Sequence, residues 1–275
     1  MPTIAYLGPE HTNTHAAAQR RFGWRSAYVH APTVDDVFHL VERRQARYGV
    51  VPVENSLEGA VTHTLDRFID FVDTPVNIHG EVEQPIRHCL IVRPGTQPAQ
   101  VRVVYSHPQA LAQCHRWLAQ HLPGVHLRET NSTADAVRYV RQAKKEDRLA
   151  AIGRMELAKE HGLQAIPIPE ERENKTRFLI LGLGESPLGR RHKTSILFAL
   201  KDKPGALHDA LGPFKRQRIN LTKIESRPSK RKAWEYLFFI DFEGHQSEPR
   251  VKRALKALES STSLLRILGS YPTAR

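Results

Sequence analysis

Along the first two thirds of the chain, segments with the hydrophobic pattern of a strand alternate with segments that have the pattern of a helix. Short apolar runs such as 4–7, 48–53 and 101–105 are typical of buried strands. Segments between them, such as 33–44, carry apolar residues at spacings of three and four, as an amphipathic helix does. Strands and helices are therefore predicted to alternate as far as residue 183. This order is typical of an α/β domain with mainly parallel sheets.

The pattern changes beyond residue 193. Four segments of alternating apolar residues predict strands, and two segments with one apolar face predict helices. Their order is strand, helix, strand, strand, helix, strand, which is the ferredoxin-like βαββαβ unit. Residues 184–193 combine Gly, Ser, Pro and Arg and predict a linker. We therefore expect one domain at 1–183 and a second at 194–272.

The composition is that of a protein with a buried core and no membrane span. The chain has 275 residues, 40% of them hydrophobic, and no apolar run approaches the roughly 18 residues that a spanning helix needs. Its first residues predict a strand and lack the regions of a signal peptide. Cys89 and Cys114 have apolar neighbours, which indicates buried thiols in a reducing compartment. A cytoplasmic protein is expected.

The formal net charge of +12 raises the question of nucleic-acid binding. The basic residues are spread over predicted helices and loops, and the densest group, Ser229–Lys232, lies in a predicted hairpin turn. Aromatic residues do not alternate with basic ones as they do on a base-stacking surface. Attraction of a small anion is therefore favoured over binding of nucleic acid.

Polar side chains gather where the predicted strands end. These clusters lie at 10–15, 54–56, 106–113, 131–133 and 174–177. A cleft bounded by strand ends is the usual place for a ligand in such a fold. In the last cluster, the Thr176 hydroxyl can donate to a leaving oxygen and the Arg177 guanidinium can hold a carboxylate. The alternative is a strand start with a surface ion pair.

Short motifs stand in a fixed order along the chain. Those of the first domain are Tyr6–Pro9, Val51–Ser56 with Gly59, Ser106–Leu111 with Gln113 and Cys114, Ser132–Ala134, and Asn174–Phe178. Those of the second domain are Gly205–His208 and Glu225–Pro228. Along nearly its whole length the chain resembles the prephenate dehydratases, and its C-terminal unit resembles their ACT regulatory domain. Several motifs in the expected order are more specific than any one of them.

The resemblance implies a fold and an assembly. The catalytic domain would form two α/β lobes, similar to type II periplasmic binding proteins, with lobe 1 at about 1–78 and 168–183 and lobe 2 at about 79–167. The ACT domains would pair in a dimer, or in a tetramer built from dimers. No helical chorismate mutase segment precedes Met1, so the single-function form is expected.

The resemblance also implies a reaction, the conversion of prephenate to phenylpyruvate in L-phenylalanine biosynthesis, with loss of water and carbon dioxide. Neither a cofactor nor a metal is implied, because aromatisation drives the reaction. Thr176 would donate to the departing hydroxyl, and Glu54 is the rival proton donor if burial and the anionic substrate raise its pKa. The catalytic candidates are Thr176, Glu54, Asn55, Ser106 and Gln113, and those for substrate binding are Thr12, Thr14, Ser56, Arg177 and Phe178. Bracing of the fold by Arg177 is the alternative to substrate binding.

Feedback by L-phenylalanine is implied for the ACT domain. The candidate effector residues are Gly205, Ala206, Leu207, His208, Glu225, Ser226, Arg227 and Pro228. One departure concerns His11–Thr14, where the family usually has Gly-Thr-aromatic-Ser, so arogenate is an alternative substrate. A non-catalytic amino-acid sensor is a further alternative. No nucleic acid and no membrane are expected as partners.

Overall fold

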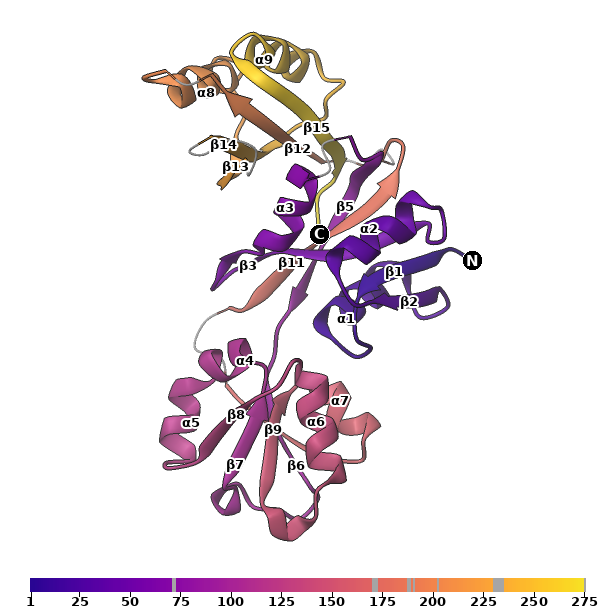
Figure 1. The fold of residues 1–275 in the computed structure, drawn as a ribbon, viewed down its shortest axis with the longest axis vertical. Coiled ribbons are helices and arrows are strands. Elements are labelled where there is room, and N and C mark those ends of the chain that lie inside the picture. The colour runs from indigo at the N-terminus through magenta and orange to yellow at the C-terminus, as the bar shows by residue number, and fades with distance from the viewer. Residues whose placement is uncertain are drawn as a thin grey trace. The chain divides into compact units, whose positions relative to one another are not determined.

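The computed structural model describes residues 1–70, 73–169, 173–186, 189, 191–201, 203–229 and 235–274 (Figure 1). The chain divides into two compact units. Unit 1 comprises Met1–Leu7, Ala17–Glu83 and Arg177–Arg275, and unit 2 comprises Gly8–Ala16 and Gln84–Thr176. Among the described residues, no helix has the length and apolar character needed to cross a membrane.

The first sheet of unit 1 has the strand order β2-β1-β3-β11-β5, with the short β4 paired to β3. Its strands are β1 (Thr3–Leu7), β2 (Ala27–Ala31), β3 (Tyr48–Asn55), β4 (Gly59–Ala60), β5 (Val76–Pro85) and β11 (Lys175–Leu183). The accompanying helices are α1 (Asn13–Phe22), α2 (Val34–Glu42) and α3 (Thr62–Asp70). The helix predicted at 33–44 is confirmed, and Thr33 caps it by accepting a hydrogen bond from the Asp36 backbone N–H at 3.1 Å.

The C-terminal part of unit 1 is the predicted βαββαβ unit. Its elements are β12 (His192–Leu200), α8 (Ala206–Arg216), β13 (Leu221–Pro228), β14 (Tyr236–Glu243), α9 (Pro249–Glu259) and β15 (Thr262–Pro272). The strand order is β13-β14-β12-β15 with antiparallel neighbours, and α8 and α9 cover one face (Figure 1). The predicted turn at Lys230–Lys232 and the strand residue Trp234 lie outside the described residues.

The opposite face of this four-stranded sheet is buried against α2 and α3. Along β12, Ile196 and Phe198 pack in the cluster under α8 and α9, whereas Leu197 packs with Phe38 and Phe68. Successive side chains of a strand point to opposite faces, so this alternation buries the sheet on both sides. The C-terminal domain is therefore packed into the core of unit 1 rather than joined to it by the linker alone.

Unit 2 contains a mixed sheet with the order β10-β6-β9-β7-β8. Its strands are β6 (Cys89–Val92), β7 (Val103–Ser106), β8 (His126–Glu129), β9 (Leu149–Gly153) and β10 (Gln164–Pro167). Mainly parallel pairing was predicted; β7 is parallel to β8 and β9, whereas β6 is antiparallel to both β9 and β10. β6 is joined in sequence to β5 and β7 and to neither of its neighbours in the sheet, so no βαβ crossover requires it to run parallel to them.

Helices cover both faces of the unit 2 sheet. They are α4 (Pro108–Gln113), α5 (His115–His121), α6 (Thr133–Gln142) and α7 (Met155–Glu160), with short 3₁₀ turns η1 (Pro98–Gln100) and η2 (Lys145–Asp147). Cys114 packs in the core under α4 and α5, and Cys89 packs in the core under α6 and α7. The prediction that both cysteines are buried is confirmed.

His79 on β5 holds the start of the linker. Its Nε2 pairs with the Gly184 carbonyl oxygen at 3.0 Å, and its own carbonyl accepts a hydrogen bond from the Ser186 hydroxyl at 2.9 Å. Burial lowers the pKa of His79 below its ordinary value of 6.5, and the contact with Gly184 opposes this only in part. The unfolded chain therefore binds this proton more readily than the folded chain does.

The free energy of unfolding should consequently fall as the pH drops below about 6.5 and stop falling below the folded pKa of His79. We expect His79→Gln to show a smaller decrease between about pH 7 and pH 5 than the unmodified chain, measured by urea unfolding. His208→Gln is the control, because the His208 side chain is 92% exposed. Equal slopes for His79→Gln and the unmodified chain would contradict the prediction.

Candidate active site

Two predicted site residues, Glu54 and Arg177, meet at neighbouring strands of the first sheet. Glu54 lies near the end of β3 and Arg177 near the start of β11. The Nε and Nη2 atoms of Arg177 both donate to Oε2 of Glu54, at 3.2 and 2.8 Å. The Arg177 side chain is 11% exposed and that of Glu54 is 35% exposed. The pair is therefore an ion pair at the edge of the core.

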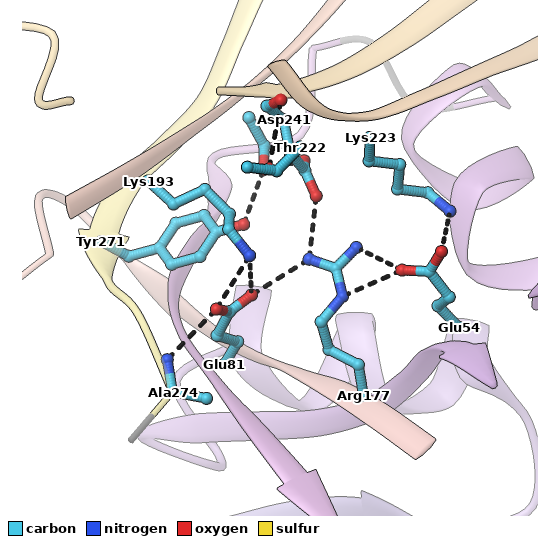
Figure 2. Close-up of polar contacts among 10 residues, drawn as sticks. Glu54, Glu81, Arg177, Lys193, Thr222, Lys223, Asp241, Tyr271 and Ala274 are labelled. Atoms are coloured by element: carbon cyan, nitrogen blue, oxygen red, sulfur yellow. Dashed lines mark hydrogen bonds and ion pairs between the residues drawn. The ribbon is translucent and has the colours of Figure 1, made fainter. Parts of the chain in front are cut away.

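The remaining donor of Arg177 is also occupied by carboxylates. Its Nη1 donates to Glu81 at 3.0 Å and to Asp241 at 2.8 Å (Figure 2). Burial by itself would lower the pKa of Arg177, but the surrounding acidic groups raise it, so the charge is permanent. Three protein carboxylates thus occupy the guanidinium that we predicted for a substrate carboxylate. The structure favours the bracing alternative for Arg177.

Glu54 is held in its ionised form. Its second oxygen, Oε1, accepts a hydrogen bond from Nζ of Lys223 at 3.1 Å. Burial by itself would raise the pKa of Glu54, but the charges and hydrogen bonds of Arg177 and Lys223 outweigh burial and lower the pKa. Glu54 was named as the rival proton donor if burial and an anionic substrate raise its pKa, and these two cations act against such a rise.

Asn55 and Ser56 follow directly after Glu54. The buried Asn55 side chain accepts hydrogen bonds from the backbone N–H groups of Leu57 and Glu58, at 2.9 and 3.2 Å. This is an Asx turn, which the short amide side chain forms readily. The turn ends β3, and the Ser56 side chain is exposed on it. Asn55 therefore fixes the shape of the loop that carries Glu54 and Ser56.

Phe178 is a core residue. It is 1% exposed and packs with Tyr6, Val50 and Ile180 on the α1 side of the first sheet. We predicted a substrate contact for Phe178, but the side chain has almost no accessible surface with which to make one. The physical reason is the strand period, which turns Phe178 to the face opposite Arg177.

Within unit 2, three side chains from separate elements form a hydrogen-bonded group. Oε1 of Gln113, at the end of α4, accepts from Nδ2 of Asn174 at 2.9 Å and lies 2.8 Å from Nε2 of His88. The Asn174 carbonyl oxygen accepts from the Ile86 N–H at 2.9 Å. These contacts hold the backbone two residues before Thr176, which is the last residue of unit 2. Through its hydrogen bond with Asn174, Gln113 thus helps to hold the segment that carries Thr176 in place.

Ser106 is fully buried at the end of β7, and its hydroxyl donates to the Ile152 carbonyl oxygen of β9 at 2.8 Å. The following helix, α4, is capped by His107, whose ring accepts from the Gln109 N–H at 3.3 Å. The Ser106 hydroxyl is oriented by the strand and bonded to the neighbouring strand, so it ties the two strands together.

The loop before α1 contains the other predicted hydroxyls. Thr12 Oγ1 accepts from the His15 N–H at 3.4 Å and donates to the Pro9 carbonyl oxygen at 3.0 Å, so Thr12 is the residue that caps the helix. Thr14 is buried. His11 has a positive φ of 64°, and its ring Nδ1 lies 3.0 Å from Glu160. His11, which departs from the usual family pattern, therefore contacts Glu160 at the end of α7.

Sequence reasoning missed several residues that the structure brings to these groups. They are His88 and Arg154 in unit 2 and Glu81, Lys193, Lys223 and Asp241 in unit 1. Arg154 is largely buried and donates to the His11 carbonyl oxygen at 3.0 Å. Lone charged residues carry no sequence signal for such contacts. Asp241 stands inside the apolar run 237–242, which was the one usable sign that it faces an interior.

The predicted effector segments lie at the start of α8 and on β13. Gly205 has a left-handed φ of 76°, and a Cβ placed there would meet no atom within 4 Å. Ala206 and Leu207 are half-buried, and His208 is exposed. On β13, Glu225 and Arg227 are half-buried, whereas Ser226 and Pro228 are exposed. Arg227 makes a two-point ion pair with Asp66 of α3, at 3.0 and 3.1 Å.

The fold and these polar groups define a class of protein, an α/β catalytic domain with a ferredoxin-like regulatory domain packed against it. The prephenate dehydratase family profile matches residues 4–186, and the ACT domain profile matches residues 194–260. The chain belongs to the prephenate dehydratase family.

Individual relatives agree with this placement. The bifunctional chorismate mutase/prephenate dehydratase of Aquifex aeolicus is 46% identical over 98% of this chain and 74% of its own length. The prephenate dehydratase of Methanocaldococcus jannaschii is 41% identical over 87% of this chain and 86% of its own. The crystal structure of the prephenate dehydratase of Arthrobacter aurescens in complex with L-Phe has a TM-score of 0.89 and 32% identity, and the match covers 99% of this chain and 90% of that one.

Proposed function

We propose that Thr176 is the residue through which this chain carries out the reaction of its family, the conversion of prephenate to phenylpyruvate with loss of water and carbon dioxide. The observation that carries this assignment is the state of Glu54, which both Arg177 and Lys223 hold as a carboxylate. A carboxylate cannot supply a proton to the departing hydroxyl. The Thr176 hydroxyl would instead donate a hydrogen bond to the leaving oxygen, keep its own proton, and stabilise the negative charge that develops as the oxygen departs as hydroxide.

The remaining predicted residues support this step. Gln113 and Asn174 hold the backbone next to Thr176, and Asn55 fixes the loop after Glu54. Ser106 ties β7 to β9 and so supports the start of α4. Thr12, Thr14 and Ser56 are proposed to bind substrate. Arg177, which is surrounded by protein carboxylates, would orient Glu54.

We also propose that L-phenylalanine binds the ACT domain and inhibits turnover. The support is that a solved relative, the enzyme of A. aurescens, carries L-Phe. The open space above Gly205 would admit an amino-acid ligand close to the backbone. A homo-oligomer, dimer or tetramer, is proposed because β13 is an edge strand of its sheet, and a cytoplasmic location is proposed from the buried cysteines.

Turnover of prephenate and of arogenate by the purified chain, each with and without L-phenylalanine, tests this proposal. We expect phenylpyruvate from prephenate and a lower rate with L-phenylalanine. Turnover of arogenate alone would keep the mechanism and change the substrate, and it would direct attention to His11 and Asn13. Binding of L-phenylalanine with no turnover of either compound would support a sensor and overturn the enzyme assignment.

A further inference from the structure

The face of the ACT sheet that packs on α2 and α3 carries polar groups beside its apolar ones. Every strand of the sheet contributes: Lys193 and Ser195 from β12, Lys223 and Arg227 from β13, Asp241 from β14, and Tyr271 from β15. Figure 2 shows Lys193 against Glu81, Lys223 against Glu54, and Asp241 against Arg177. The regulatory domain therefore reaches the residues of the candidate active site directly.

Lys223 and Arg227 are four residues apart on β13 and point to the same side of the strand. Lys223 bonds to Glu54 on β3, and Arg227 bonds to Asp66 on α3. The Lys223 side chain is 8% exposed, so its ammonium group is largely removed from water. Glu54 is 35% exposed, so Lys223 is the buried member of a pair at the edge of the solvent.

Asp241 is oriented by a chain of buried hydroxyls. The Tyr271 hydroxyl lies 2.7 Å from Ser195 Oγ, and Ser195 Oγ donates to Asp241 Oδ1 at 2.5 Å. The other oxygen of Asp241 accepts from Arg177. Ser195 is 3% exposed and Tyr271 is fully buried, so the core of the ACT domain sets the position of this carboxylate.

Among the described residues the charges of this group balance. Glu54, Glu81 and Asp241 face the cations Arg177, Lys193 and Lys223, and each contact is an ion pair of 2.8–3.1 Å. Removing one member of a buried ionic group leaves its partner without compensation. Two of the six, Lys223 and Asp241, act on the Glu54–Arg177 pair from the ACT domain.

We propose that Lys223 and Asp241 of the ACT domain are positioning residues for catalysis, which hold the Glu54–Arg177 pair in the geometry and charge state that the dehydration uses. The inference rests on the proposed function, in which Glu54 acts as a carboxylate. The charged groups facing Glu54 are Arg177 of β11 and Lys223 of β13. Glu81 of β5 and Asp241 of β14 accept hydrogen bonds from Nη1 of Arg177. The ACT domain is thus part of the catalytic scaffold even without effector.

Single variants of the full chain separate this role from a structural one. Lys223→Met removes a positive charge beside Glu54, so the acid limb of the pH profile of kcat/KM should move to higher pH, with kcat lowered about 10-fold. Asp241→Asn removes a negative charge behind Arg177, so the same limb should move to lower pH. Lys223→Arg should restore the original profile. Lys252→Met, an exposed position on α9, is the control and should leave the profile unchanged.

Shifts in opposite directions support the proposal, since damage to the fold alone would not give them. A Lys223→Met profile equal to that of Lys252→Met, or equal shifts for Lys223→Met and Asp241→Asn, would overturn it. If the unmodified chain turns over neither substrate, the proposed function fails and the catalytic role of Lys223 and Asp241 fails with it, and stability then tests the Lys223–Glu54 contact alone. The double variant Lys223→Met with Glu54→Gln should then lose less stability at about pH 7 than the two single variants add up to. A stability loss in the double variant equal to the sum of the two single losses would contradict an interaction between Lys223 and Glu54.

Discussion

Thr176→Val is expected to lower kcat for prephenate by about 100-fold or more while the KM changes little. Valine keeps the branched shape of threonine and removes only the hydroxyl, so the segment held by Gln113 and Asn174 should keep its conformation. The loss should appear in kcat because the hydroxyl donates to an oxygen whose charge develops only as the bond breaks. Steady-state kinetics with purified variants measure it.

Thr176→Ser is the matched control, since serine retains the hydroxyl and should keep most of the rate. Glu54→Gln is the second comparison. If Glu54 were the proton donor, the amide would abolish the rate while Thr176→Val would not. A kcat for Thr176→Val within a few-fold of the original would remove Thr176 from the mechanism.

Gly269→Ala is expected to destabilise unit 1 by about 2–5 kcal/mol, the sum of an overpacked contact and a strained backbone. Gly269 lies on β15 with a φ of +154°, and a Cβ placed there would be 2.2 Å from the Ile78 carbonyl oxygen of β5. The neighbouring atom is backbone, so no side-chain rotation relieves the clash. The two strands would have to separate where the ACT sheet meets the α/β domain.

Thermal unfolding measures this effect. Gly80→Ala is the matched control, because Gly80 also lies on β5 and its nearest contacts to an added Cβ are at 3.7 Å. We expect Gly80→Ala to change the stability by less than about 1 kcal/mol. Equal melting temperatures for the two variants would show that the approach of Gly269 to Ile78 is not needed for stability. Gly269 also pairs with Ser195, so Gly269→Ala should disturb the orientation of Asp241.

The sequence by itself determined the kinds of elements and much of their order. The βαββαβ order of the ACT domain and the cap at Thr33 follow from local periodicity and local hydrogen bonding, which depend on residues a few positions apart. It also placed Glu54 and Asn55 at the end of one strand and Thr176 and Arg177 at the start of another, because polar residues beside an apolar run mark where a strand leaves or enters the core. These signals depend on residues that are close together in the sequence, so they can be recognised without the tertiary structure.

Only the tertiary structure decided what those residues touch. Arg177 was predicted to bind a substrate carboxylate, yet Glu54, Glu81 and Asp241 surround it, and their positions in the chain lie 64 to 123 residues away. Phe178 was predicted to contact substrate, yet the strand period turns it into the core. The direction of a pKa shift depends on the balance between burial and neighbouring charges, and for Glu54 that balance was set by Arg177 and by Lys223 from another domain. Contacts between distant segments arise from packing, and no local pattern encodes them.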